Sequence, residues 1–187
     1  MQINSNLQDP TETNYDSPFQ KSNSEENKNI SVTFGEDVTR VPAYLFEDSS
    51  YIAEVNFSEN ITEIGDYVFS GCSSLTSVNL PKSLKAIGSG AFSNSGLSEI
   101  YVNGNLEDGQ YYIESPSGVS MSLERPFGGT TKNIHLIFNE GVTRIPSEVF
   151  ASNKSIVSIT LPNSIRTISS HAFSGCEALA TVNFWMI

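Results

Sequence analysis

The side chains most often used for catalysis are few and scattered in this chain of 187 residues. There are two histidines, His135 and His171, and two cysteines, Cys72 and Cys176, the latter 104 residues apart. None of the motifs of a zinc protease, a serine hydrolase, a phosphate loop or a dinucleotide-binding turn occurs. The acidic pairs lack the spacing of a calcium-binding loop. The sequence therefore predicts no catalytic residues, no metal ligands and no cofactor, and we expect that the protein is not an enzyme.

The charge balance narrows the classes of partner. The chain has 10 basic and 21 acidic residues, a formal net charge of −11. Nucleic acid and anionic lipid surfaces bind clusters of Lys and Arg, and no cluster here exceeds two such residues. No run of about 18 apolar residues, the length that a membrane-spanning helix needs, is present. We therefore expect neither nucleic acid binding nor membrane insertion.

Internal repetition is the main signal in the sequence. Phenylalanines recur every 23 residues in two groups, Phe46, Phe69 and Phe92, then Phe127, Phe150 and Phe173. The gap between the groups is 35 residues, one period plus twelve. A longer period of 104 residues relates "KNISVTFGEDVTRVPAYLF" from Lys28 to "KNIHLIFNEGVTRIPSEVF" from Lys132. The sequence therefore indicates a duplicated block of short repeats, in which the Phe column is core packing.

One unit, "LTSVNLPKSLKAIGSGAFSNSG" from Leu75, shows what each repeat contains. Val78-Asn79-Leu80 alternates as a short strand with one buried face, and Pro81 ends it. About six buried side chains stabilise a unit by roughly 10–18 kcal/mol. Ordering the backbone costs roughly 1–2 kcal/mol per residue, which is more than that gain for a single unit. The repeats must therefore stack as a solenoid.

The stretches "LTSVNLPKSLKAIGSGAF" and "IVSITLPNSIRTISSHAFSGCEAL" resemble the BspA-like (Treponema pallidum-type) leucine-rich repeats. The resemblance covers about residues 30–102 and 127–184. It implies an α/β-type repeat solenoid, a right-handed coil with a short-stranded parallel β-sheet on the concave face and coil or short helical turns on the convex face. It also implies a cell-surface or secreted location, because the family occurs on surface and secreted proteins, where several members act in adhesion. It transfers no functional residues.

The organisation follows from the repeat register. We expect a disordered polar tail or linker over residues 1–29, with any signal sequence trimmed, because the tail has no apolar stretch. Residues 30–187 then form a solenoid of about six to seven repeats with an insertion within 103–126. We expect seven strands, centred near residues 33, 56, 79, 101, 137, 160 and 183.

One outward position of each strand faces the concave surface, because side chains alternate along a strand. That column is Thr33, Asn56, Asn79, Tyr101, Ile137, Thr160 and Asn183, mostly small and polar. We expect Tyr101 and Ile137 to be neighbours, flanked by Glu99 and His135, and to bind a host surface or matrix protein or another bacterial surface protein. Two alternatives stay open: the insertion covers these residues, or the chain is a structural spacer without a ligand.

The insertion and the C-terminal end carry further expectations. "YYIESPSGVSMSL" is expected to close as a hairpin around Pro116-Ser117-Gly118, with Tyr111 and Tyr112 as contact residues; the alternatives are a loop without function or a hinge. Cys72 and Cys176 are too far apart for a disulfide and are expected to be buried. The sequence stops midway through a repeat, which predicts either a fragment of a longer solenoid or an end that pairs with a second copy.

Overall fold

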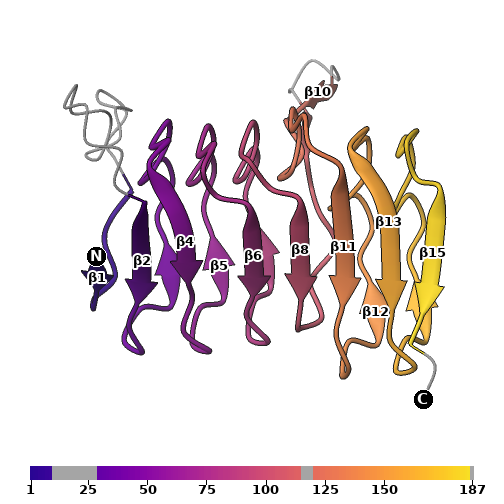
Figure 1. Ribbon diagram of the computed structural model, residues 1–187, viewed down its shortest axis with the longest axis horizontal. Helices are drawn as coiled ribbons and strands as arrows, with labels where there is room; N and C mark the ends of the chain where they lie inside the picture. Colours follow the sequence, from indigo (N-terminus) through magenta and orange to yellow (C-terminus); the bar gives the residue numbers. More distant parts are fainter. Residues whose placement is uncertain (10–28, 115–119, 186–187) are drawn as a thin grey trace.

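The computed structural model describes residues 1–9, 29–114 and 120–185 and shows two layers of strands (Figure 1). The longer strands form a front layer, and short strands behind them run in the opposite direction. The front strands are β1 (Gln2–Ile3), β2 (Ile30–Phe34), β4 (Ile52–Asn56), β6 (Ser77–Leu80), β8 (Glu99–Val102), β11 (Ile134–Phe138), β13 (Ile156–Leu161) and β15 (Thr181–Phe184). The back strands are β3 (Arg40–Val41), β5 (Glu63–Ile64), β7 (Ala86–Ile87), β12 (Arg144–Ile145) and β14 (Thr167–Ile168).

The front layer confirms the parallel solenoid and all seven expected strands. Its strands pair in parallel in the orders β1-β2-β4 and β6-β8-β11-β13-β15. Their inward residues are buried because each turn covers the next. The last pair differs: Val182 and Phe184 are 49% and 67% exposed, since no described turn follows β15. Association of this end with a second copy stays a prediction, for which the test is a concentration-dependent mass in light scattering.

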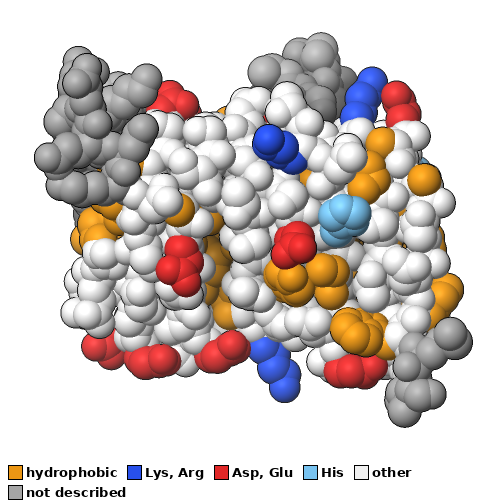
Figure 2. Space-filling view, in the orientation of Figure 1, with side chains coloured by type: hydrophobic (Ala, Val, Ile, Leu, Met, Phe, Trp, Pro, Cys, Tyr) orange, Lys and Arg blue, Asp and Glu red, His pale blue; other side chains and the backbone are white. Residues whose placement is uncertain are grey.

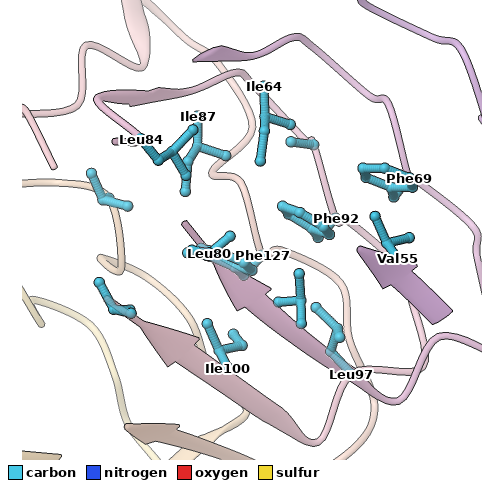
Figure 3. Packing of buried hydrophobic residues seen from close by; sticks show 14 of the residues in the cluster. Val55, Ile64, Phe69, Leu80, Leu84, Ile87, Phe92, Leu97, Ile100 and Phe127 are labelled. Atoms are coloured by element: carbon cyan, nitrogen blue, oxygen red, sulfur yellow. The ribbon is translucent and has the colours of Figure 1, made fainter. Parts of the chain in front are cut away.

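The Phe column is core packing, as expected. Phe69, Phe92 and Phe127 are fully buried and lie among the aliphatic side chains of successive turns (Figure 3). Neighbouring rings of the column are stacked with centroids 5.3–6.0 Å apart. The twelve extra residues between Phe92 and Phe127 therefore leave the solenoid without interrupting its core.

The prediction of short helical turns on the convex side is wrong. The described residues contain no helix; the second layer is a ladder of two-residue strands, β3-β5-β7 and β12-β14. Backbone N–H groups after β3 donate to the next turn instead of to their own, as from Tyr44 to Asp66 and from Phe46 to Val68. Residues with positive φ interrupt each turn at two equivalent positions. The first position is occupied by Tyr44, Tyr67, Gly90, Glu148 and His171. The second is occupied by Asp48, Gly71, Asn94, Gly129, Ser152 and Gly175. Left-handed residues at this frequency prevent an α-helix from propagating.

The prediction of a disordered tail is wrong for residues 1–9. Residues 10–28 lie outside the described residues. β1 pairs in parallel with β2, and Ile3 is buried against the core. The prediction rested on polar composition, whereas β1 is held by backbone hydrogen bonds from Thr33 to the carbonyl of Met1 and from Gly35 to that of Ile3, in addition to the burial of Ile3.

The segment after β1 repeats the segment after β8. The Asn6 side-chain oxygen accepts hydrogen bonds from the backbone N–H groups of Thr39 (2.9 Å) and Arg40 (3.2 Å). The Asn105 oxygen accepts the equivalent bonds from residues 143 (2.9 Å) and 144 (3.1 Å). Asp9 and Asp108 each pair with the arginine of the adjoining back strand, residues 40 and 144. The duplication therefore extends to the first residues of the chain, and each copy caps the free edge of one back ladder.

Candidate interaction surface

The parallel register brings four of the predicted residues together on the front face. Tyr101 of β8 lies directly opposite Ile137 of β11, and Glu99 lies opposite His135. Tyr101 and Ile137 are half-buried, whereas Glu99 and His135 are exposed. The predicted neighbourhood is thus confirmed, and its role in binding stays a prediction. We call these four residues the β8–β11 patch.

The Tyr101 ring is oriented by its own strand. Its hydroxyl donates a 2.8 Å hydrogen bond to Oε2 of Glu99, two residues earlier. This hydrogen bond directs the phenol along β8 toward Glu99. The Glu99 hydrogen bond also raises the pKa of Tyr101, because ionisation would place two negative oxygens side by side.

The other half of the patch is fixed by β13. Nδ1 of His135 lies 2.6 Å from Oγ of Ser158, the residue opposite it in the register. This contact directs the imidazole toward β13. Among the described residues, the Glu99 carboxylate has Tyr101 as its one hydrogen-bond donor.

The patch differs from the rest of the front face. Hydrophobic side chains gather over β8 and β11, while the surface over β2, β4 and β6 is mostly polar (Figure 2). Acidic side chains lie over β4 and β8, and the visible Lys and Arg side chains lie toward the rims. None of the described front strands contains a Lys or an Arg.

Two described segments of the insertion pair antiparallel, as a hairpin requires; the predicted turn at Pro116-Ser117-Gly118 lies outside the described residues. β9 (Tyr112–Glu114) pairs antiparallel with β10 (Ser120–Ser122). The hairpin projects from the edge at which the front strands begin, beside β8 and β11 (Figure 1). Its described residues therefore form a rim and do not cover the patch.

Tyr111 is a core residue, so its prediction as a contact residue is wrong. It is 4% exposed, and its hydroxyl donates to the carbonyl of Ile87 (2.8 Å). Burial raises the pKa of the Tyr111 hydroxyl. The guanidinium of Arg125 lies over its ring at 5.4 Å and donates to the carbonyls of Tyr111 and Leu123, which joins the two ends of the insertion. The side chain of Tyr112 lies outside the described residues.

The sequence did not indicate the role of Arg125. Its side chain also pairs with Glu148 (2.6 Å) and is 19% exposed. A lone arginine after an insertion has no pattern that distinguishes it from a surface residue; the one available signal was its place immediately before Pro126 and Phe127, where the repeat resumes.

A groove of about 400 Å³ lies on the back layer and was not predicted. It exists because residues 120–122, which the repeat would place beside β7, pair with β9 instead. Backbone N–H of Glu107 and the Tyr111 hydroxyl occupy the open carbonyls of Lys85 and Ile87, so the ladder edge at β7 is closed.

The remaining chemistry-bearing residues are structural or isolated. Both cysteines are free; Cys72 is buried and Cys176 half-buried, and burial raises the pKa of the Cys72 thiol to about 12. His171 is exposed. Within the described residues no three His, Cys, Asp or Glu side chains are grouped as metal ligands. The same part of the chain holds no helix long and apolar enough to cross a membrane.

Comparisons with known proteins agree with the repeat pattern. A sequence model described as "BspA type Leucine rich repeat region" matches in six copies over residues 16–115 and 110–186. No curated protein matches the chain.

Several solved structures are similar to the chain. A leucine rich cell surface protein from Faecalibacterium prausnitzii is 27% identical over 82% of this chain and 41% of its own, with a TM-score of 0.39. A leucine-rich repeat protein from Bacteroides ovatus is 20% identical over 83% and 60%, with a TM-score of 0.38. The pneumococcal vaccine antigen PcpA is 17% identical over 82% and 50%, with a TM-score of 0.34. The chain therefore spans less than two thirds of the length of each.

Proposed function

Because the chain belongs to the BspA-type leucine-rich-repeat family, we propose that it is a non-enzymatic protein-interaction module that binds its partner through the β8–β11 patch. The observation that carries the proposal is the pairing of Tyr101 with Ile137 in an otherwise polar front face. The family resemblance supports a cell-surface or secreted location and a role in adhesion, with a host surface or matrix protein or another bacterial surface protein as partner.

The composition of the patch suits recognition. Protein interfaces concentrate their binding energy in a few aromatic and aliphatic side chains that polar groups surround. Tyr101 and Ile137 supply the apolar centre, and Glu99 and His135 supply hydrogen-bonding groups at its edge. The Tyr101–Glu99 and His135–Ser158 contacts hold these side chains in place before binding, which reduces the entropy lost on association.

The sheet and the hairpin have different roles in partner binding. The stacked core fixes the patch, and the hairpin limits the approach of a partner from the edge at which the front strands begin. A partner segment that lies across β6, β8 and β11 meets no described residue of the insertion.

A pull-down from host cell-surface and matrix extracts tests the proposal. The baits are the wild type and Tyr101→Ala/Ile137→Ser. The matched control is Thr33→Ala/Asn56→Ala, because these two residues face each other in the equivalent register of β2 and β4. Circular dichroism and melting curves first establish that all baits fold alike.

The proposal predicts a protein retained by the wild type and the control and lost by Tyr101→Ala/Ile137→Ser. Equal retention by all three baits would exclude the β8–β11 patch as the site. Retention of nothing by any bait would favour the alternative function, a structural spacer within a larger surface protein.

A further inference from the structure

We infer that the β8–β11 patch receives an arginine side chain of the partner, with the guanidinium on the Tyr101 ring and against the Glu99 carboxylate. This inference rests on the proposed function and names the chemistry of the partner at that site. It follows from the position of the ring, the carboxylate oxygen that accepts no hydrogen bond from a described residue, and the charge of the surrounding sheet.

The ring provides the platform. The Tyr101 hydroxyl is bound to Glu99, which directs the ring along β8, and the side chain is half-buried, so part of the ring is accessible to a ligand. Aromatic faces carry negative electrostatic potential and attract cations, and a planar guanidinium stacks on them more completely than an ammonium group does. The half-buried ring thus offers a flat surface of the shape that arginine fits.

The carboxylate provides the charge. Glu99 is exposed, and Tyr101 occupies one of its two oxygens, Oε2. No Lys, Arg or His among the described residues forms an ion pair with it. A guanidinium that lies over the ring reaches the carboxylate from the same side, and such charge-assisted hydrogen bonds are stronger than neutral ones.

The neighbouring strands complete the site. Ile137 lies opposite Tyr101 on β11 and provides an apolar contact for the aliphatic stem of an arginine. On the other side, β6 presents Ser77 and Asn79, which are uncharged. The described front strands carry Glu54 and Glu99 and no Lys or Arg, so the face attracts a cation and repels an acidic partner.

A titration followed by nuclear magnetic resonance tests the inference on the chain as it stands. The probe is N-acetyl-L-arginine methylamide at millimolar concentrations. The citrulline analogue, which has the same shape and no charge, is the matched comparison, and a neutral trisaccharide tests whether the ring is a sugar platform instead. Backbone amide signals of Tyr101, Ile137 and His135 report binding.

The variants separate the two contacts. Glu99→Gln keeps an acceptor for the Tyr101 hydroxyl and removes the charge. Tyr101→Leu keeps apolar area and removes the ring face. Thr33→Ala/Asn56→Ala is again the control. We expect saturable shifts at the patch with the arginine probe, roughly tenfold weaker binding of the citrulline analogue, and a similar loss in both patch variants.

Three results would overturn the inference: equal binding of arginine and citrulline, arginine binding that both patch variants retain, or saturation of the patch by the trisaccharide and not by arginine. The pull-down distinguishes this failure from failure of the proposed function. If capture still depends on Tyr101 and Ile137 while the arginine titration fails, the patch remains the interaction site and its partner contributes other chemistry.

Discussion

Phe92 and Phe127 are separated by 35 residues in sequence, yet their rings stack with centroids 5.3 Å apart and planes within 7° of parallel. Elsewhere in the column the same contact joins residues 23 apart. The solenoid thus tolerates an insertion at this turn because the chain leaves and re-enters the stack at the same position, and the patch on β8 and β11 sits over that continuous core.

Removal of a ring from the middle of the column is expected to destabilise the whole solenoid. Phe92→Ala leaves a cavity between two stacked rings, and we expect a loss of about 3–5 kcal/mol in the free energy of unfolding. Phe173→Ala, at a half-buried position in the last described turn, is the matched comparison and is expected to cost less. Equal losses in chemical denaturation would contradict the continuous-stack account.

Asn6 and Asn105, which cap the two back ladders, are expected to contribute similarly to the free energy of unfolding. Asn105→Ala removes the acceptor for two backbone N–H groups, and we expect a loss of about 1 kcal/mol, with a similar loss for Asn6→Ala. Asn105→Asp keeps an acceptor oxygen and is expected to cost less. Asn79→Ala, on the exposed face, is the control. Denaturation midpoints that are unchanged in both alanine cap variants would show that water replaces the caps.

Asp108 is expected to contribute stability that depends on pH. Hydrogen bonds from the backbone N–H of Ser147 and from Arg144 lower the pKa of Asp108 to about 2. Because this value is below the usual one of about 3.9, the carboxylate stabilises the fold above about pH 4, and that contribution is lost as the pH falls toward 2. Asp108→Asn should therefore be less stable than the wild type at pH 7, and the difference should shrink below pH 4. Asp37→Asn, at an exposed turn, is the control, and a pH-independent difference for Asp108→Asn would refute this role.

Arg125 is expected to hold the base of the insertion. Arg125→Met removes the bonds to the carbonyls of Tyr111 and Leu123, so the Leu123 amide, which donates to Tyr111, should exchange its hydrogen faster. Arg166→Met, whose guanidinium contacts only nearby carbonyls among the described residues, is the control. An unchanged exchange rate at the Leu123 amide would mean that Tyr111 holds the base of the insertion without Arg125.

Spacing determined most of what could be predicted from the sequence. The 23-residue period placed the seven front strands from β2 to β15, and the alternation of Val78, Asn79 and Leu80 fixed which side chains face outward. Given that register, Tyr101 and Ile137 had to be neighbours, although 36 residues separate them. Repeats make such long-range contacts readable because each turn copies the last.

What the sequence did not reveal depends on contacts that break the repeat. Tyr111 and Tyr112 look alike in sequence, and only the fold shows that Tyr111 fills the core where the back ladder ends. The back ladder was missed because two-residue strands are too short for a periodic pattern. The seating of residues 1–9 was missed because "INSNLQD" from Ile3 and "VNGNLED" from Val102 are 99 residues apart, outside the 104-residue period that revealed the duplication.

Photo-cross-linking from position 137 tests the central claim most directly. Ile137 is replaced by p-benzoylphenylalanine, and the same replacement at Thr33 on β2 serves as the matched control on the same face. Both proteins are irradiated with the partner captured in the pull-down. The account predicts a covalent adduct from position 137 and none from position 33. Equal adducts from both positions, or an adduct from position 33 alone, would show that the partner does not bind at Tyr101 and Ile137.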